Sequence, residues 1–340
     1  MTTGAMPTAV LGTTGMEITR VGLGAWAMGG AGWAYSWGAQ DDAEAVRTIR
    51  AAVDSGINWI DTAAVYGLGH SESLVGQAVH TIPEADRPFV FTKCGRVWDA
   101  DNPLAEPRSV AAAASLRREL DASLRRLNVD RIDLYQVHQP AEDGTAVEEY
   151  WATMLGFVAA GKVRAVGLSN HDVGQLAIAE QVGHVESLQP PLSAIDRDAA
   201  SELLPWCQRN ATGVIVYSPM QSGLLTGKYT TASVADLPAD DWRRTSADFT
   251  DNLDRNLAVV DAVRTVAARH DATPSAVAVA WTLAWPGVTG AIVGARSPRQ
   301  IDAWIGAGSL ELTRDDLASI AAAIRTARVG SGPELPPTAD

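Results

Sequence analysis

Four residues in the first half of the chain have side chains suited to proton transfer. Asp61, Lys93 and His138 each close a short apolar run, and Tyr66 follows shortly after Asp61. A phenol with an ordinary pKa of about 10 is a poor proton donor at neutral pH. A nearby ammonium group would lower that pKa, and a carboxylate would keep the ammonium charged. We therefore predict that Tyr66 exchanges a proton, that Lys93 and Asp61 tune it, and that a neutral His138 positions a substrate oxygen.

These side chains need elements that bring their strand ends together. Alternation places Trp59 with Asp61 on one face, and Phe91 with Lys93 on one face. In a barrel of parallel strands, catalytic side chains lie at the carboxyl ends of several strands. The sequence contains eight short apolar runs that predict such strands: Gly22–Gly24, Ile57–Asp61, Phe89–Lys93, Ile132–His138, Val163–Leu168, Ser187–Gln189, Gly213–Tyr217 and Gly290–Val293.

Most gaps between these runs have the period of amphipathic helices. The predicted helices cover residues 41–54, 109–128, 147–161, 173–181, 199–209, 253–270, 274–284, 298–305 and 314–326. Alternating strands and helices predict a parallel sheet. Eight repeats favour an α/β fold of the (β/α)₈ TIM barrel type over an open doubly wound sheet.

The barrel is predicted to occupy one domain, residues 1–340, with a core from about residue 8 to 327. An N-terminal β-hairpin over residues 9–19 precedes it, and a proline-rich stretch, 330–340, is expected to be a flexible tail. Two long irregular stretches, 95–108 and 221–250, follow the third and seventh strands. Loops of this length at the C-terminal face of a barrel commonly cover a site.

Composition excludes several classes of protein. The formal net charge of −13 argues against a nucleic-acid partner, because phosphate binding needs clustered Lys and Arg. Two cysteines, Cys94 and Cys207, are too few for a disulfide scaffold and fit a reducing cytoplasm. No apolar stretch is long enough to predict a membrane span, and no His or Cys spacing predicts a metal site.

Five segments resemble the signatures of the aldo-keto reductase superfamily, in the same order. They read GINWIDTAAVYG at 56–67, FTKCG at 91–95, IDLYQVH at 132–138, VGLSNH at 166–171 and VYSP at 216–219. The similarity extends over about residues 8–327 and is closest to the bacterial NADP-dependent type. It implies an oxidoreductase that reduces aldehydes, ketones or sugar-like carbonyls to alcohols, or catalyses the reverse, with Tyr66 as general acid and base.

The resemblance also implies an NADP(H) site, with NAD(H) as the alternative. Gly24, Ala25 and Trp26 would line the nicotinamide end together with Asp61. Carboxamide contacts are implied for Ser169, Asn170 and Gln189, and stacking on the ring for Tyr217. The rest of the nucleotide would lie on Ser218, Pro219, Gln221, Ser222, Gly223, Leu225, Gly294, Ala295, Arg296, Gln300 and Trp304.

Some of these roles have alternatives in the residues themselves. Ser169 and Asn170 are also typical caps for the helix that follows. Arg296 could meet the 2′-phosphate of NADP, whereas Arg299 is a weaker candidate that is also explained as a solvated helix residue. Many family members have an acidic residue followed by Asn where this chain has Ala303 and Trp304. Trp304 would then pack on adenine or fill the core, and the choice between NADP and NAD stays open.

Aromatic residues are candidates for the walls of a substrate pocket. The pocket is predicted to contain Trp26, Tyr66, Trp98 and His138, with Trp33, Tyr35 and Trp37 as further candidates. The alternative for each aromatic loop residue is ordinary packing. The predicted partner is a small carbonyl or alcohol.

Two other functions use the same residues. The chain could be a cofactor-binding sensor or partner subunit whose chemistry is vestigial. It could also be a barrel aldolase or isomerase that forms a Schiff base on Lys93. A lysine held by Asp61 suits that chemistry less well than an unpaired one.

Overall fold

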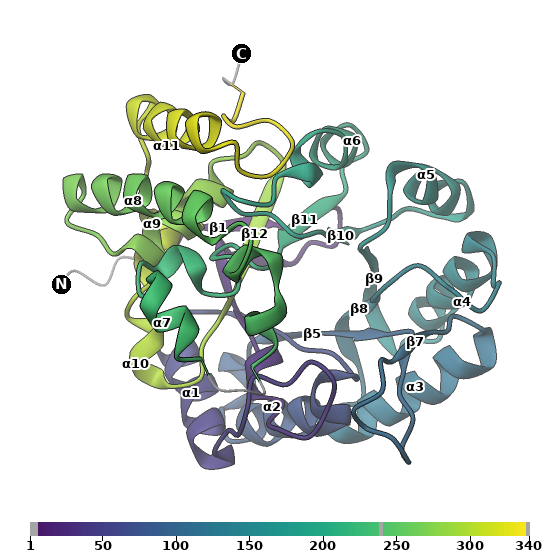
Figure 1. Cartoon of the computed structure of the whole chain (residues 1–340). Coiled ribbons are helices and arrows are strands. Elements are labelled where there is room, and N and C mark those ends of the chain that lie inside the picture. The colour runs from purple at the N-terminus through teal and green to yellow at the C-terminus, as the bar shows by residue number, and fades with distance from the viewer. Residues whose placement is uncertain (1–5, 238–240, 338–340) are drawn as a thin grey trace.

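Eight parallel strands form a closed barrel in the computed structural model, which describes residues 6–237 and 241–337 (Figure 1). The order around the barrel follows the chain: β3 (Val21–Gly24), β4 (Trp59–Asp61), β5 (Phe89–Cys94), β8 (Ile132–Val137), β9 (Val163–Ser169), β10 (Ser187–Gln189), β11 (Gly213–Val216) and β12 (Val288–Gly294). Each corresponds to one predicted run. The predicted (β/α)₈ barrel is therefore confirmed.

Helices surround the barrel, and most lie where the periodicity predicts them. They are α1 (Asp42–Asp54), α3 (Ala113–Leu127), α4 (Val147–Ala159), α5 (Val173–Val182), α6 (Leu203–Arg209), α8 (Leu253–Arg269), α9 (Pro274–Leu283), α10 (Pro298–Ile301) and α11 (Arg314–Ala327). Two are shorter than predicted. α6 begins after a 3₁₀ turn at Asp198–Ala200, and α10 ends at Ile301, before a turn that leads into the 3₁₀ segment Ile305–Ser309.

Helix α2 (His70–His80) was not predicted. It is buried on several sides, so its sequence has no clear apolar stripe. Gly76 also weakens the helical signal of the sequence. The structure explains this glycine, because a Cβ there would lie 2.6 Å from the carbonyl oxygen of Leu127 on α3.

The N-terminal hairpin closes the bottom of the barrel. Its strands, β1 (Thr8–Val10) and β2 (Glu17–Thr19), are antiparallel, as predicted. Ile18 of β2 and two residues of the connecting turn join a core inside the barrel that contains Leu11, Met16, Ile18, Trp59, Phe91, Leu134, Ala165, Ile215 and Ile292. The Trp59 indole donates to the carbonyl of Thr19 over 2.8 Å. The interior of the barrel is thus packed with side chains. The candidate catalytic residues lie at its upper end, where the carboxyl ends of the strands meet.

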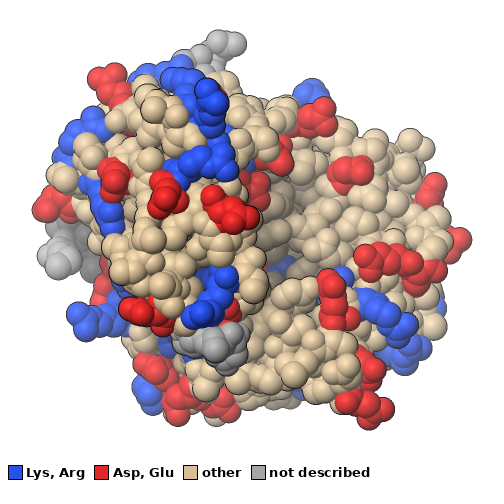
Figure 2. Space-filling view, in the orientation of Figure 1, with Lys and Arg blue, Asp and Glu red and all other residues tan. Residues whose placement is uncertain are grey.

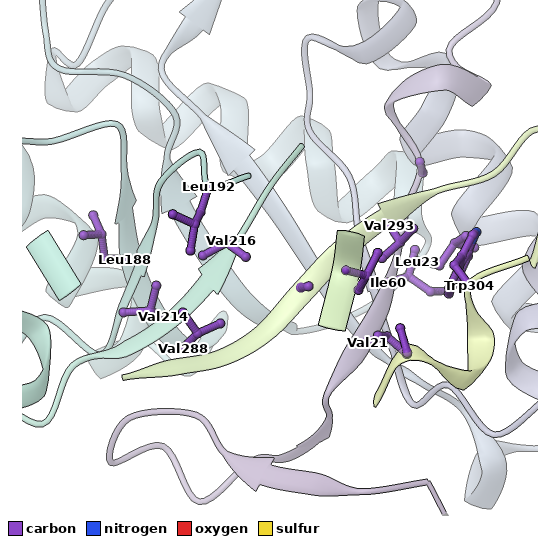
Figure 3. Close-up of a cluster of buried hydrophobic side chains, with 14 of the residues drawn as sticks. Val21, Leu23, Ile60, Leu188, Leu192, Val214, Val216, Val288, Val293 and Trp304 are labelled. Atoms are coloured by element: carbon purple, nitrogen blue, oxygen red, sulfur yellow. The ribbon is translucent and has the colours of Figure 1, made fainter. Parts of the chain in front are cut away.

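A second core lies between the strands and the surrounding helices. In Figure 3, Val21, Leu23, Ile60 and Val293 from three neighbouring strands lie close to Trp304. Residues of the same three strands that alternate with these lie inside the barrel or at its mouth. The outer layer therefore fixes the strand ends that carry the polar residues.

The two long stretches after β5 and β11 are more ordered than the sequence suggests. The first contains a short antiparallel pair, β6 (Arg96–Val97) and β7 (Arg108–Ser109). The second contains α7 (Thr231–Ala235) and the 3₁₀ turns Leu224–Thr226, Trp242–Thr245 and Ala247–Phe249. Residues 238–240 of this second stretch lie outside the described residues.

The described part of the C-terminal segment packs on the barrel. The Arg197 guanidinium is buried and donates to the carbonyl of Val329 over 2.8 Å. Nη1 of Arg325 lies 3.3 Å from Oε2 of Glu334. The expected flexible tail therefore makes defined contacts before residue 338, and its last three residues lie outside the described range. No helix in the part of the chain described here has the length and apolar character to cross a membrane.

Candidate active site

Two strand ends bring Asp61 and Lys93 into a buried ion pair. The Lys93 ammonium lies 2.5 Å from Oδ1 of Asp61 and donates to the Thr62 carbonyl over 2.9 Å. The Gln189 amide donates to Oδ2 of Asp61 over 2.9 Å. Burial lowers the pKa of Lys93 and raises that of Asp61, and each partner opposes the shift of the other. The pair is fixed by contacts from several strands.

Tyr66 reaches this pair from the loop after β4. Its hydroxyl lies 3.4 Å from Nζ of Lys93. The loop turns sharply at Gly67, where φ is +59° and a Cβ would lie only 2.1 Å from the carbonyl oxygen of Gly29. Glycine is required there, because the loops carrying Trp26 and Tyr66 pack backbone against backbone. The two rings consequently stack, with centroids 6.1 Å apart.

His138 follows β8 and lies beside Tyr66. Its backbone N–H donates to the Cys94 carbonyl over 3.0 Å, and its ring meets the Tyr66 ring edge-on at 5.7 Å. Among the described residues, Nδ1 of His138 is buried and has no hydrogen-bond partner. Burial, followed by the charges of Lys93 and Arg96, lowers the pKa of His138 well below 6.5. The imidazole is therefore neutral at neutral pH.

The predicted direction of the Tyr66 pKa shift was wrong. Lys93 was expected to lower it, but burial, assisted by the Asp61 carboxylate, raises the pKa of Tyr66 well above 10. The main reason is burial of the hydroxyl. In addition, Asp61 lies closer to the ammonium than the phenol does and offsets its charge. The phenol thus holds its proton firmly at neutral pH.

A buried polar layer behind the site was missed in the sequence. Ser71, at the start of α2, donates to the Ala25 carbonyl over 2.9 Å, and its oxygen lies 2.9 Å from the Thr62 hydroxyl. The next residue, Glu72, accepts from Thr92 and Arg126, each over 2.6 Å. These contacts fix residues next to Trp26, Asp61 and Lys93. A Ser-Glu pair soon after Tyr66 was the available signal.

A cavity of about 1310 Å³ opens over the catalytic residues. It includes Asp61, Tyr66 and His138 in its lining, and extends past Tyr217 to the segment after β12. Figure 2 shows the surface hollowed between the side formed by α7 and the side formed by α4. Its extended shape suits a long ligand together with a small one.

In the part of the cavity beside His138, amide side chains and an aromatic ring are linked by hydrogen bonds. Asn170 donates to the His138 carbonyl over 2.9 Å and accepts from the Tyr217 hydroxyl over 2.8 Å. The Ser169 hydroxyl donates to the Gln189 carbonyl over 2.9 Å. Neither Ser169 nor Asn170 caps α5, because Asp172 does so. These groups match the partners that a nicotinamide carboxamide and ring need.

Beyond Tyr217, the chain turns through a run of left-handed residues. Ser218, Gln221, Ser222 and Gly223 all have positive φ. A compact loop of this kind brings backbone groups close to a ligand. Most other residues expected at the nucleotide also line the cavity: Gly24, Trp26, Pro219, Gly294, Ala295, Arg296, Gln300 and Trp304. Gln221, Leu225 and Ala25 lie behind this lining, and Gln221 instead bonds Ser193 and Asp248.

Arg296 has contacts that the sequence did not predict. Its guanidinium donates to the side chain of Gln40 over 2.9 Å, to the Trp37 carbonyl over 3.0 Å and to the Ala39 carbonyl. The Gln40 amide returns a bond to the Arg296 carbonyl over 3.0 Å. Arg296 thus ties the segment after β12 to residues 37–40.

Aromatic residues form the opposite wall. Trp26, Trp33, Tyr35 and Trp37 line the cavity, whereas Trp98 packs against the buried cluster that contains Trp33 and is not part of the lining. The role of Trp98 as a pocket wall stays a prediction. Two residues outside the prediction reinforce this wall: Trp242 stacks on Trp26 at 6.2 Å, and the Arg243 guanidinium lies 4.9 Å from the centre of the Trp37 ring.

The fold and the site together define a barrel oxidoreductase that acts on carbonyl compounds. A family model described as "Aldo/keto reductase family" matches residues 20–325. The chain belongs to this family, as the sequence segments indicated. The family uses nicotinamide cofactors.

Individual relatives agree with this assignment. The chain is 36% identical to the aldo-keto reductase YhdN of Bacillus subtilis, over 85% of each chain. It is 33% identical to the NADH-specific methylglyoxal reductase of Escherichia coli, over 90% of this chain and 94% of that relative. The solved structure of the glycerol dehydrogenase AKR11B4 from Gluconobacter oxydans superimposes with a TM-score of 0.84 at 33% identity, covering 100% of this chain and 98% of that one.

Proposed function

We propose that this protein is an NADP(H)-dependent reductase of aldehydes, ketones or sugar-like carbonyls, with Tyr66 as its general acid. The observation that carries the proposal is the buried contact of Lys93 with both Asp61 and the Tyr66 hydroxyl, beside a neutral His138. In reduction, the bound nicotinamide supplies hydride to the carbonyl carbon.

Side chains of the protein orient the substrate and transfer the proton. His138 donates a hydrogen bond to the substrate oxygen without giving up a proton. Tyr66 then donates its proton to that oxygen as negative charge develops on it. The Lys93 ammonium, 3.4 Å away, stabilises the phenolate that results. Asp61 keeps Lys93 charged and in place. In the reverse direction, the Tyr66 phenolate accepts the proton of the alcohol.

The residues present fit a dinucleotide cofactor. Ser169, Asn170 and Gln189 would hold the carboxamide and Tyr217 would stack on the ring. Phosphates would lie along residues 218–223 and 294–300, where a Cβ on Gly294 would meet only the Gly24 carbonyl oxygen, at 4.0 Å. Trp304 is buried in the core and lines the cavity, so it would contact the adenine end from one side.

The preference for NADP rests on cations at the far end of the cavity. Arg299 and Lys228 are exposed and line it, and within residues 6–237 and 241–337 Arg299 has no hydrogen-bond or ion-pair partner. A guanidinium free to bind a phosphate favours NADP over NAD. We assign the 2′-phosphate to Arg299, and to Arg296 a supporting role through its contacts with residues 37–40.

A tryptophan fluorescence titration with NADPH and with NADH tests the cofactor assignment, since Trp26, Trp37 and Trp304 line the cavity. Saturable quenching with tighter binding of NADPH is expected. A panel of aldehydes and ketones, followed by nicotinamide absorbance, then tests turnover. Binding of neither nucleotide would remove the basis of the proposal.

Two other functions predict different results. A sensor with vestigial chemistry would bind NADPH, but it would not oxidise the cofactor with any carbonyl compound of the panel. In a Schiff-base enzyme, borohydride would reduce the imine between the substrate and Lys93 and leave the substrate covalently attached to that lysine. The contacts of Lys93 with Asp61, Thr62 and Tyr66 disfavour the latter, because a Schiff base needs an unprotonated, unpaired amine.

A further inference from the structure

Arg96 lies at the end of the cavity that contains Tyr66 and His138. Its positive charge has no role in the reaction proposed above. The chain turns at Gly95, with φ +84°, directly after β5, so β6 begins over the mouth of the barrel. Arg96 lines the same cavity as Tyr66 and His138, and its side chain is only 13% exposed. Its charge also contributes to the lowered pKa of His138, which agrees with a position close to the reacting groups.

The surroundings of Arg96 hold its guanidinium in place. Nη1 donates to the hydroxyl of Ser109 over 2.8 Å, across the β6–β7 pair. The N–H of Gly95 donates to Glu119 over 2.8 Å. A cation fixed in this way loses little conformational entropy when it binds an anion.

The carboxylate nearest to Arg96 is weakly held. Oε1 of Glu106 lies 3.6 Å from Nη2 of Arg96 and accepts a hydrogen bond from Tyr35 over 2.7 Å. The Glu106 side chain is 74% exposed, and exposed ion pairs contribute little to stability. A second carboxylate on this rim, Glu142, is exposed and accepts from the Ser109 N–H over 3.2 Å. Glu106 therefore shows where an anion contacts Arg96 and Tyr35, and an incoming anion can displace it.

We propose that Arg96 and Tyr35 form a subsite for an anionic group, a carboxylate or phosphate, on the part of the substrate remote from the carbonyl. Glu106 competes for the same position. This rests on the proposed reductase function and narrows it, because carbonyl compounds with an anionic tail become the preferred substrates. The aromatic walls contact the part of the substrate between the two ends.

Two probes that differ in charge test the subsite: 4-formylbenzoate and its methyl ester. The measured quantity is the ratio of kcat/KM for the acid to that for the ester. Arg96→Gln should lower this ratio about tenfold or more, as expected for a lost hydrogen bond to a charged group. Glu106→Gln should raise it severalfold. Arg108→Gln is the matched control, because Arg108 is exposed on the same hairpin and does not line the cavity.

Tryptophan fluorescence gives the Kd of 4-formylbenzoate in each variant without turnover. If wild-type protein reduces neither these probes nor any carbonyl of the panel, the reductase proposal fails, and the effect of Arg96→Gln on this Kd still tests the subsite. The subsite is overturned if Arg96→Gln weakens both probes equally, or if it leaves the ratio where Arg108→Gln leaves it. If Arg96→Gln does not fold, Glu106→Gln decides, and an unchanged ratio overturns the proposal.

Discussion

The ammonium nitrogen of Lys93 lies 2.5 Å from the carboxylate of Asp61, with both side chains almost fully withdrawn from solvent. Charges removed from water in this way depend on each other, because neither is stabilised by solvent. The pair therefore does two things. It holds a cation beside Tyr66, and it makes the upper end of the barrel sensitive to the loss of either partner.

Asp61→Asn should destabilise the fold by about 3 kcal/mol, since it leaves a buried ammonium without its counter-charge. Urea unfolding of the variant measures this. Asp121→Asn is the control, because it breaks an exposed pair with Lys162 and should change stability little. Equal stability of the two variants would show that Lys93 is not held as a buried cation.

The buried His171 should make stability fall in mild acid. Burial lowers the pKa of His171 from 6.5 to about 4. The hydrogen bond to the Ser169 carbonyl has the opposite effect on this pKa, but it is smaller. The unfolded chain binds a proton below pH 6.5 and the folded chain does not until about pH 4, so stability is complete above 6.5 and falls below it. The loss from this residue between pH 7 and pH 5 should be about 2 kcal/mol.

Urea unfolding at both pH values, in wild type and in His171→Gln, measures that contribution. The variant should lose less stability on acidification than wild type. His80→Gln, at the exposed end of α2, is the control and should behave as wild type. An identical pH dependence in all three proteins would contradict the assignment of this effect to His171.

Arg296 and Arg299 should affect cofactor binding differently. Arg299→Met should weaken NADPH about tenfold and NADH little, since only NADPH has the 2′-phosphate. Arg296→Met should weaken both cofactors to a similar degree, because it releases residues 37–40. Fluorescence titrations of each variant with both cofactors measure these effects. The assignment is reversed if Arg296→Met affects NADPH alone.

Much of this architecture could be predicted from the sequence, because the strands are short apolar runs with a polar residue at the end. Alternation places Asp61 on the same face as Trp59, and Lys93 on the same face as Phe91. The parallel pairing of β4 with β5 then brings the two strand ends together. The hairpin below and the helices with a clear stripe were found in the same way. Helix α2 was missed since it is buried on several sides.

What could not be predicted depends on contacts between distant loops. Nothing local to Arg296 indicates that it bonds residues 37–40, and nothing local to Arg243 indicates that it lies on Trp37. The Tyr66 pKa was misjudged for a related reason. The sequence shows which groups meet, but the balance between burial and the distances of Asp61 and Lys93 exists only in the folded chain.

Tyr66→Phe tests most directly whether Tyr66 donates the proton. Cofactor affinity by fluorescence and kcat with a saturating aldehyde should be measured beside Tyr135→Phe, which removes a buried hydroxyl that has no partner in the described residues. We predict that Tyr66→Phe binds NADPH as wild type does and loses about 100-fold or more in kcat, whereas Tyr135→Phe keeps its activity. A Tyr66→Phe variant with wild-type kcat would contradict the account.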